Sequence, residues 1–385
     1  MNNKICNNSV NLLFFINDPL IANTGVTKKI KSQIEAFDNI CDSVFVCNLS
    51  VDNRKRFFSG EVVSGNKLLS KIPYFLRYDF SGIDEKIIAH KINVVYIRYT
   101  HFSSPAFIRF LRRLQKFGIH IIMEFPTFPY DEEYKTLPFK SNIKLLIDKC
   151  FRMKMAEYTK LAVCFTKNDS IFGIPAFTIS NGIGIERMNY ISSKLKRTYR
   201  AVNTDVDFIA VSSLEKWHGY DRFISGIYEY IKREPSKNIH FHIVGEGREV
   251  NNLVRLVDKL GVEPYVTFHG HCTGEKLDEL LLKADIGVDS LARHRVNNFE
   301  NNSLKSKEYL TFGLPIVKSH RDHSIDSCEY FINVPSDESH IEIDDILNWY
   351  YVSNFKKRKD EINQFAKENF SWEKQMQKLL MTVLP

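Results

Sequence analysis

The sequence predicts an α/β protein built from two doubly wound parallel-sheet domains, and three observations support this fold class. With 385 residues, the chain is long enough to bury two separate cores. Its 44% hydrophobic and 26% charged residues are typical of a globular protein and exclude a disordered or fibrous one. Short apolar runs alternate with stretches of helical period along the whole chain, which is the pattern of successive βα units.

Twelve apolar runs of strand length define the two sheets. The six in the first half lie at 11–16, 43–49, 93–99, 119–125, 160–166 and 175–180. The six in the second half lie at 207–213, 239–245, 266–271, 286–290, 314–319 and 329–334. Helical patterns separate them, among them 107–118, 140–160, 219–234 and 275–284. Each half therefore predicts one parallel sheet whose strands are joined by helices.

The charge distribution marks the boundary between the two domains. Residues 1–200 hold 30 Lys and Arg against 17 Asp and Glu, whereas residues 201–385 hold 23 against 29. This switch and the polar, basic stretch at 187–204 predict an N-terminal domain at 1–190 and a C-terminal domain at 204–371. The chain ends in a helical pattern at about 372–385, which we expect to pack back on the N-terminal domain.

Cysteine spacing and the length of the apolar runs bear on the cellular compartment. The seven cysteines include no CxxC pair, and several lie in apolar strand-like runs. We therefore expect the reduced, buried thiols of a cytoplasmic protein. The first apolar run, 12–16, is too short for a secretory signal, and no run reaches the roughly 18 residues of a membrane span.

Basic side chains are interleaved with apolar ones at 107–118 and 140–160. Two interpretations remain open: ordinary amphipathic helices, or helices that also lie on an anionic membrane surface. The second interpretation would place the protein peripherally on the inner face of the cell membrane. No recognised nucleic-acid motif accompanies the positive charge, so nucleic acid is not an expected partner.

Three turns that follow predicted strands are candidate phosphate- or nucleotide-binding segments. Glycine in such a turn lets backbone N–H groups approach a ligand, and open α/β sheets bind ligands at the carboxyl ends of their strands. The residues concerned are Gly25, Ser213, Lys216, His218, Gly245, Glu246 and Gly247. None of the turns completes a GxGxxG pattern, so a structural turn or a basic surface loop remains an alternative for each.

The stretch FENNSLKSKEYLTFGLPIV carries the strongest functional pattern. Glu300 and Glu308 are eight residues apart, with Ser303, Leu304 and Lys305 between them. If Glu308 lies in the first turns of a helix, its carboxylate can bind two vicinal ribose hydroxyls. Lys305 would add positive charge for a diphosphate, and Glu300 can reach a sugar hydroxyl. A spaced pair of glutamates usually means solvated charge, but its position before a Gly-Leu-Pro turn and a strand makes this one specific.

With these motifs the second half resembles the retaining GT-B glycosyltransferases of glycosyltransferase family 4, whose donor domain carries an E-x7-E motif before a Gly-Leu-Pro strand. The resemblance extends over VSSLEKWHGYDRF, HIVGEG, VTFHGH, ADIGVDS and FSWEKQ. The first half resembles the bacterial surface-polysaccharide branch of that family through NTGVTKKIKSQIEAF, VYIRYTHFSSPAFIRFL and IIMEFPTFPYDEEY. Together these segments span nearly the whole chain.

The resemblance implies a GT-B fold, with two Rossmann-like domains on either side of an interdomain cleft. Glu308 would bind the ribose, Glu300 the transferred sugar, and Gly25 the donor phosphates from across the cleft. The turn from Gly245 to Gly247 would line the nucleotide pocket. The resemblance also implies a nucleotide-diphosphate sugar as substrate, transfer with retention, and no bound metal or other cofactor.

One departure from the family pattern concerns the phosphate site. The family's GRLxxxKG segment aligns with SSLEKWHG, so Ser213 and His218 replace an arginine and a lysine that neutralise the leaving diphosphate. Lys216, Lys305 and a protonated His218 are the expected substitutes. A literal DxD at 205–207 precedes its strand, whereas a metal-binding DxD should follow one, so we interpret it as linker charge. No His/Cys/Glu cluster has metal-ligand spacing.

Polar residues at predicted strand ends of the first domain mark the acceptor side: Arg98, His101, Glu124, Tyr130 and Asp131. His101 and Glu124 are candidate acid/base or sugar-binding groups, and with Glu300 they are the catalytic candidates. For each, the alternative is a polar residue that stabilises its own turn. A basic domain that touches a membrane would suit an oligosaccharide acceptor on a lipid diphosphate carrier.

The expected function is that of a hexosyltransferase acting on a growing surface polysaccharide such as O-antigen, other lipopolysaccharide or capsule. Two alternatives keep the fold: a sugar-nucleotide epimerase, and a transferase with a soluble acceptor. A third is a non-catalytic nucleotide-sugar binding protein, because the usual arginine and lysine are replaced.

Overall fold

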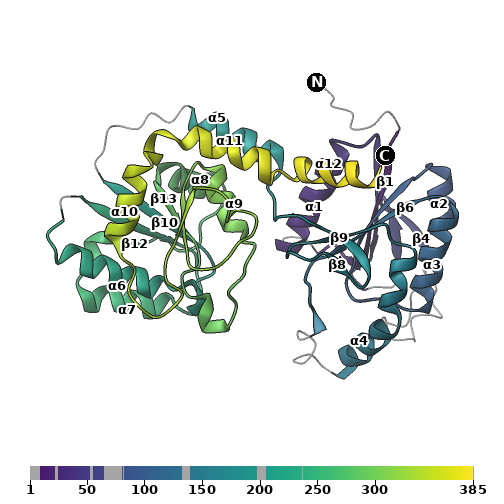
Figure 1. Ribbon diagram of the computed structural model, residues 1–385, viewed down its shortest axis with the longest axis horizontal. Helices are drawn as coiled ribbons and strands as arrows, with labels where there is room; N and C mark the ends of the chain where they lie inside the picture. The colour runs from purple at the N-terminus through teal and green to yellow at the C-terminus, as the bar shows by residue number, and fades with distance from the viewer. Residues whose placement is uncertain are drawn as a thin grey trace. The chain divides into compact units, whose positions relative to one another are not determined.

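The computed structural model describes residues 9–21, 25–52, 55–64, 80, 82–131, 139–196, 205–235 and 237–384. The chain divides into two compact units (Figure 1). Unit 1 runs to Ser180 and includes the C-terminal segment from Trp372, and unit 2 runs from Asn181 to Ser371. Each unit is an α/β structure around its own sheet, as the sequence predicts.

Unit 1 contains a nine-stranded sheet in the order β4-β3-β2-β1-β5-β6-β7-β9-β8. Its six central strands are parallel: β2 (Ser43–Leu49), β1 (Asn11–Pro19), β5 (Val94–Arg98), β6 (His120–Phe125), β7 (Leu161–Cys164) and β9 (Ile174–Thr178). Antiparallel strands extend both edges: β3 (Arg56–Phe58), β4 (Glu61–Ser64) and β8 (Ser170–Ile171). The six predicted strands are confirmed, whereas the antiparallel edge strands lie outside the longer apolar runs and were not predicted.

The alternation of side chains along β1 assigns a set of helices to each face of this sheet. Leu12, Phe14 and Ile16 pack in the core beneath α1 (Gly25–Asp38) and α12 (Trp372–Val383). Leu13 and Phe15 pack in the opposite core. That core is covered by α2 (Ile83–Ala89), α3 (Pro105–Lys116) and α4 (Phe139–Phe151), which continues into the 3₁₀ helix η4 (Arg152–Glu157).

Two helices near the unit boundary are assigned by what they bury. The Trp372 side chain is 1% exposed in the core beneath α1, so α12 belongs to unit 1. Helix α5 (Ile185–Leu195) buries Met188 and Ile191 in the core of unit 2. The sequence places the end of the first domain at residue 190. In the structure, the division at Ser180 comes before α5 because that helix packs on the second core.

Unit 2 contains a six-stranded sheet, parallel throughout, in the order β12-β11-β10-β13-β14-β15. The strands are β12 (Val266–Phe268), β11 (Ile239–Val244), β10 (Val206–Val211), β13 (Ile286–Val288), β14 (Ile316–Lys318) and β15 (Phe331–Asn333). Besides α5, its α-helices are α6 (Tyr220–Ile231), α7 (Val250–Leu260), α8 (Gly274–Lys283), α9 (Leu304–Thr311), α10 (Ile343–Val352) and α11 (Lys359–Phe370). All six predicted strands of the second half are confirmed.

Both sheets are doubly wound, and each reverses its strand order once. In unit 1 the chain builds outward from β1 through β2, then returns to the other side of β1 with β5. In unit 2 it builds from β10 to β12, then returns beside β10 with β13. In open α/β sheets, ligands bind outside the carboxyl ends of the two strands where this reversal occurs. The reversals β1/β5 and β10/β13 are therefore where a site is expected.

Over the described part of the chain, no helix combines the length and the apolar character that crossing a membrane requires.

Candidate functional site

A buried tyrosine fixes the geometry of the β10/β13 reversal. The two strands pair only as far as Ile209 opposite Gly287. Beyond that point, the Tyr309 hydroxyl of α9 accepts from Val211 N–H at 2.9 Å and donates to the Val288 carbonyl at 3.3 Å. A Cβ at Gly287 would lie 2.5 Å from the Tyr309 ring, so only glycine lets α9 pack this close to β13. The packing of α9 thereby places its charged residues at the strand ends.

Lys305 of α9 forms a largely buried ion pair with Asp289, the residue that follows β13. The Lys305 Nζ lies 3.0 Å from Asp289 Oδ1 and 3.4 Å from Ser290 Oγ. The second oxygen of Asp289 accepts from Ser306 Oγ at 2.6 Å. Burial acts to raise the pKa of Asp289, but Lys305 and then His320 hold it well below its ordinary value. Both groups are therefore ionised. The sequence predicted Lys305 here, but not Asp289.

The two predicted glutamates lie on accessible surfaces of unit 2. Glu308 is exposed on α9, one turn after the exposed Leu304, and lies three residues from Lys305 on the same helix. Glu300 is exposed on the preceding loop, where its carboxylate lies 3.4 Å from His323 Nε2. Both carboxylates can therefore be reached by a ligand.

Ser303, by contrast, is a buried anchor for the start of α9. Its backbone N–H donates to Asp322 Oδ2 at 3.2 Å, and the same carboxylate pairs with the fully buried Lys307. These contacts fix the loop that carries Glu300 to the helix that carries Glu308. The structure therefore gives Ser303 a positioning role.

The loop after β10 brings Ser213, Lys216 and His218 to the same strand end. Ser213 and Lys216 are exposed, and His218 in the 3₁₀ helix η5 (Lys216–His218) is 6% exposed. The His218 Nδ1 accepts from the Glu215 backbone N–H at 3.2 Å, so a neutral ring carries its proton on Nε2. Burial, followed by the charge of Lys305, lowers the pKa of His218 to about 3. The imidazole is thus neutral at neutral pH and does not supply the positive charge expected of it.

The turn from Gly245 to Gly247 packs against the same loop. Gly245 has φ of 131°, and a Cβ there would lie 1.8 Å from the Ser212 carbonyl oxygen. A Cβ at Gly247 would lie 2.2 Å from the carbonyl oxygen of Leu214, whose N–H donates to the Glu246 carbonyl at 2.8 Å. Backbone packing therefore requires both glycines, which agrees with the interpretation of this segment as a structural turn. The Glu246 side chain is exposed.

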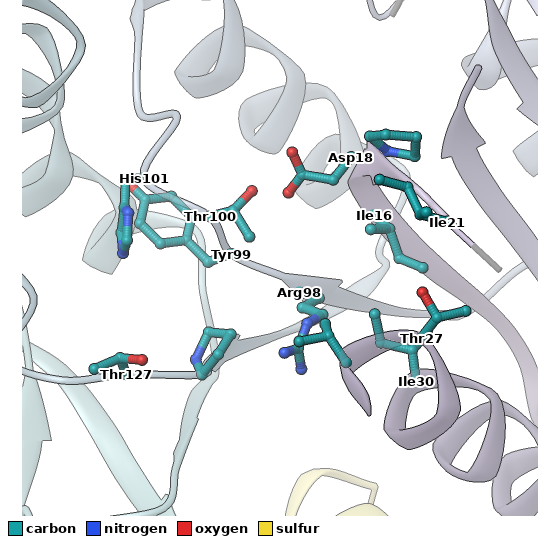
Figure 2. Close-up of a pocket in the computed structure, with 13 residues that line it drawn as sticks. Ile16, Asp18, Ile21, Thr27, Ile30, Arg98, Tyr99, Thr100, His101 and Thr127 are labelled. Carbon is teal, nitrogen blue, oxygen red and sulfur yellow. The ribbon is translucent and has the colours of Figure 1, made fainter. Parts of the chain in front are cut away.

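The β1/β5 reversal of unit 1 opens into a pocket of about 410 Å³ (Figure 2). It lies over the end of β1, the start of α1 and the segments that follow β5 and β6. Its walls are mainly apolar, with a few hydroxyl and charged groups. The lining residues are Ile16, Asp18, Pro19, Ile21, Val26, Thr27, Ile30, Arg98, Tyr99, Thr100, His101, Pro126 and Thr127. Gly25, the first residue of α1, directly precedes this wall, and residues 22–24 lie outside the described part of the chain.

Asp18 is the acidic group of this pocket and was not among the predicted residues. Its carboxylate and the Thr100 hydroxyl point toward one another (Figure 2) and form a hydrogen bond. Burial raises the pKa of Asp18, while Thr100 and Lys144 act to lower it. The Lys144 Nζ donates to the Thr100 carbonyl at 2.8 Å. Asp18 is the penultimate residue of β1 and Asp289 directly follows β13, so both lie at the carboxyl end of a strand at a reversal, which is the signal that could have identified Asp18.

Arg98 and Glu124 form a buried ion pair at the base of the unit 1 site. Arg98 lines the pocket, whereas Glu124 is fully buried and is absent from the lining. The Glu124 carboxylate accepts from Arg98, from the Tyr96 hydroxyl at 2.7 Å and from Gln33 Nε2 at 3.0 Å. With three donors already bound, this carboxylate holds Arg98 in place and has no direct route to a ligand in the pocket.

His101, Tyr130 and Asp131 belong to a second polar group beside the pocket. The His101 ring lines the pocket and lies 3.8 Å, between centroids, from the buried Tyr130 ring. Burial, then Lys144, lowers the pKa of His101 to about 3, so the ring is neutral. The Tyr130 hydroxyl donates a hydrogen bond to Asp148 at 2.6 Å. The Asp131 carboxylate accepts hydrogen bonds from both terminal nitrogens of Arg152, at 2.7 and 3.2 Å. Only His101 of these three reaches the pocket.

The described residues contain no group of three or more His, Cys, Asp and Glu side chains arranged to hold a metal ion. The Asp205 and Asp207 side chains lie at the amino end of β10, the end away from the strand-order reversal. There Asp205 accepts from Asn238 at 3.1 Å, and Asp207 lies 3.5 Å from a nitrogen of His242.

Comparison with known proteins locates a family domain in unit 2. Residues 205–335 match the family model described as glycosyl transferases group 1. Mannosylfructose-phosphate synthase of Agrobacterium fabrum is 29% identical over 115 residues, which are 28% of this chain and 24% of that enzyme. The match thus spans about a quarter of that relative.

Solved structures resemble the whole chain. Anabaena HepE in complex with UDP has a TM-score of 0.59 at 14% identity, covering 97% of this chain and 100% of that one. Sucrose-phosphate synthase of Thermosynechococcus elongatus has a TM-score of 0.58 at 14% identity, covering 97% and 98%. At this identity the likeness concerns the fold. Residues 205–335 form a glycosyl transferases group 1 domain, within a chain that has the GT-B fold of such glycosyltransferases.

Proposed function

We propose that this protein transfers a hexose from a nucleotide-diphosphate sugar, with retention, to a growing surface polysaccharide on a lipid diphosphate carrier. The observation that carries the proposal is the presence of Lys305 and Glu308 on one helix at the β10/β13 reversal of the group 1 domain. HepE, which shares the fold, is solved with UDP and with UDP-glucose. O-antigen and capsule are the expected polymers.

The donor end of the reaction follows from the residues around α9. The Glu308 carboxylate binds the two ribose hydroxyls, and Glu300 binds a hydroxyl of the hexose. As the bond to the sugar breaks, negative charge develops on the leaving diphosphate and must be stabilised. The Lys305 ammonium and the neutral His218, which donates through Nε2, supply hydrogen bonds at the strand end. Protein cations of this kind support a reaction that needs no bound metal.

The unit 1 pocket suits a neutral sugar as acceptor. Its polar groups include the hydroxyls of Thr27, Thr100 and Thr127 and the Asp18 carboxylate. These groups exchange hydrogen bonds with sugar hydroxyls, and the apolar walls can contact the C–H faces of a sugar ring. The carboxylate would repel a phosphate. We therefore assign the pocket to the terminal sugar of the acceptor and not to its diphosphate end.

The exposed surfaces of α3 and α4 support contact with an anionic membrane. The apolar side of α3 is buried, which leaves Arg109, Arg112 and Lys116 exposed. On α4 and η4, Leu146 is 64% exposed and Met153 is 59% exposed. Basic side chains beside exposed apolar ones favour attachment to the membrane surface without insertion of the helix.

The proposal is tested by incubating purified protein and bacterial membranes with a panel of labelled nucleotide sugars. We expect label in the lipid extract, release of a nucleoside diphosphate, and a product anomeric configuration that matches the donor when read by NMR. Absence of both transfer and nucleotide release with every donor would contradict the proposal. Each alternative has its own signature. An epimerase changes the donor sugar without an acceptor, a soluble-acceptor enzyme does not float with liposomes, and a binding protein retains the donor unchanged.

A Glu308→Ala variant tests whether the activity depends on this site. The loss of charged hydrogen bonds to the ribose should raise the KM for the donor about 10- to 100-fold. Glu308 is exposed, so the free energy of unfolding should change little. Glu279→Ala, at an exposed position on α8, is the matched control and should behave as wild type.

A further inference from the structure

The charge of Lys305 is already balanced at the β10/β13 reversal. Its Nζ lies 3.0 Å from the ionised, fully buried Asp289, so the pair brings no net charge to an incoming anion. His218, which stands where the family carries lysine, is neutral. A diphosphate with two or more negative charges therefore needs a further cation at this strand end.

Backbone hydrogen bonds place Arg293 at this point. The segment after β13 is bonded to the loop after β10, with Leu291 N–H donating to the His218 carbonyl at 2.8 Å and Ala292 N–H donating to the Trp217 carbonyl at 3.2 Å. A Cβ at Gly219 would lie 2.7 Å from Ala292 Cβ, so the two loops pack in direct contact. Arg293 is the next residue and begins the 3₁₀ helix η7 (Arg293–Val296).

The Arg293 guanidinium has no carboxylate as an ion-pair partner within the described part of the chain. Its Nε is buried and has no hydrogen-bond partner. In the orientation that satisfies both ends of the Asn298 amide, that amide oxygen accepts from one terminal nitrogen of Arg293 at 2.7 Å. Burial lowers the pKa of Arg293, and Asp289 opposes this only from beyond ion-pair distance. An anionic ligand would compensate the buried charge.

Arg295, two residues further along η7, shows the opposite arrangement. Its guanidinium binds both oxygens of Asp221, at 2.9 and 2.8 Å, and its Nε lies 2.9 Å from Glu338 Oε1. These carboxylates fix Arg295 as a structural residue that holds η7 against α6. The contrast shows that this short helix neutralises one of its arginines and leaves the other without an acid.

We propose that Arg293 is a phosphate-binding residue that takes the place of the arginine and lysine missing at Ser213 and His218. The inference rests on the proposed function, since it assumes a nucleotide-diphosphate donor at this site. The ligand class is the diphosphate of that donor and of the released nucleoside diphosphate. The guanidinium donates from its unpartnered Nε and a terminal nitrogen to phosphate oxygens, and Lys305 and His218 Nε2 donate beside it.

The assignment is tested by calorimetric titration of the wild-type chain with UDP, GDP, ADP and CDP, and with the matching nucleosides. For the nucleotide that binds, Arg293→Met should weaken the diphosphate about 10- to 100-fold, because one charge-assisted interaction is lost. Affinity for the nucleoside should not change. Arg293→Lys should retain part of the diphosphate affinity, and Arg255→Met, at an exposed position on α7, should retain all of it. Thermal unfolding of each variant verifies that it is folded.

The outcomes separate this inference from the proposed function. If the wild type binds a nucleoside diphosphate and both Arg293 variants bind it equally well, the assignment of Arg293 is overturned and the donor site stands. If Arg293→Met weakens the nucleoside as much as the diphosphate, the residue acts on the pocket as a whole and not on phosphate. If the wild type binds none of the four diphosphates, the proposed function fails and the assignment fails with it.

Discussion

In unit 1 the reversal between β1 and β5 opens into a mainly apolar pocket with hydroxyl groups and one carboxylate at its rim. In unit 2 the reversal between β10 and β13 is occupied by the charged groups of Asp289, Lys305 and Arg293. The two sheets have the same winding, so the topology determines where each site lies. The chemistry of each site is determined by the few residues at that position.

The position of the ion pair in each unit shows how this difference arises. In unit 1, Arg98 lines the pocket and is paired with Glu124, which lies on the neighbouring strand beneath the pocket, and the pair stabilises the sheet from within. In unit 2, Asp289 lies just beyond its strand and is paired with Lys305 from a helix, at the level of the strand ends. A pair beneath the site leaves a pocket for neutral hydroxyls, whereas a pair at its rim lets a cation interact with a phosphate.

Lys305→Met should have the largest effect on this comparison. Sugar transfer should fall about 100- to 1000-fold, as for loss of a donor that stabilises developing charge. The free energy of unfolding of unit 2 should fall by about 3–5 kcal/mol, because Asp289 becomes an uncompensated buried charge. Activity assays and chemical denaturation measure the two effects.

The double variant Asp289→Asn with Lys305→Met separates the two roles. Neutralising Asp289 should restore most of the stability, while transfer should remain as low as in the single variant. If the double variant regains transfer, Lys305 serves only to balance Asp289, and the contrast between the two units would be one of stability alone.

Glu124→Gln should affect mainly stability. Arg98 would remain buried without an acid, which should cost about 3–5 kcal/mol in the free energy of unfolding, measured by chemical denaturation. The kcat of the folded fraction should change little, because the carboxylate is absent from the pocket lining. A folded Glu124→Gln protein whose kcat falls about 100-fold would instead support the acid/base role that its position in the sequence suggests.

The sequence alone predicts the strands well because each lies in an apolar run, and the inner strands β1, β5, β6 and β7 are buried almost throughout. All twelve apolar runs form strands, whereas the antiparallel β3, β4 and β8 lie outside these runs. The boundary of α5 is harder to predict. Its polar exposed side resembles a linker, and only the tertiary packing of Met188 and Ile191 assigns it to unit 2.

Residues that the motif requires to be accessible could be selected from the sequence. Glu308 and Glu300 are exposed, as a ligand-binding carboxylate must be, and their roles stay predictions. Asp289 and Arg293 were missed because their importance comes from what surrounds them: the first balances Lys305, and the second has no acid of its own. Glu124 shows the opposite case. Its position at a strand end makes it a candidate catalytic residue in the sequence, but in the structure its carboxylate already accepts hydrogen bonds from three donors.

His101 in unit 1 and His218 in unit 2 give each unit a pH dependence of the same sign, because burial lowers the pKa of both rings. The pKa of His218 is about 3 in the folded protein and that of an unfolded histidine is about 6.5, so protons favour the unfolded chain. Its contribution is complete above pH 6.5 and should fall by about 2 kcal/mol on acidification to pH 5. Denaturation at pH 7 and pH 5 should show that His218→Gln reduces the loss of stability in unit 2 by about this amount. Part of the loss should remain, because burial also lowers the pKa of His240, His269 and His320. An undiminished difference in the variant would mean that another group titrates.

Val26→Trp should have the smallest effect and tests the assignment of the unit 1 pocket. Val26 lines the pocket and is 57% exposed, so a larger side chain reduces the volume of about 410 Å³ without entering the core. The KM for the acceptor should rise about 10-fold, equivalent to about 1.4 kcal/mol of binding free energy. Hydrolysis of the donor without acceptor should not change, because that step needs only the β10/β13 site. Val51→Trp, at a position that is 76% exposed, controls for added bulk. If Val26→Trp slows donor hydrolysis as much as transfer, the pocket takes part in donor binding, and the division of chemistry between the units would have to be abandoned.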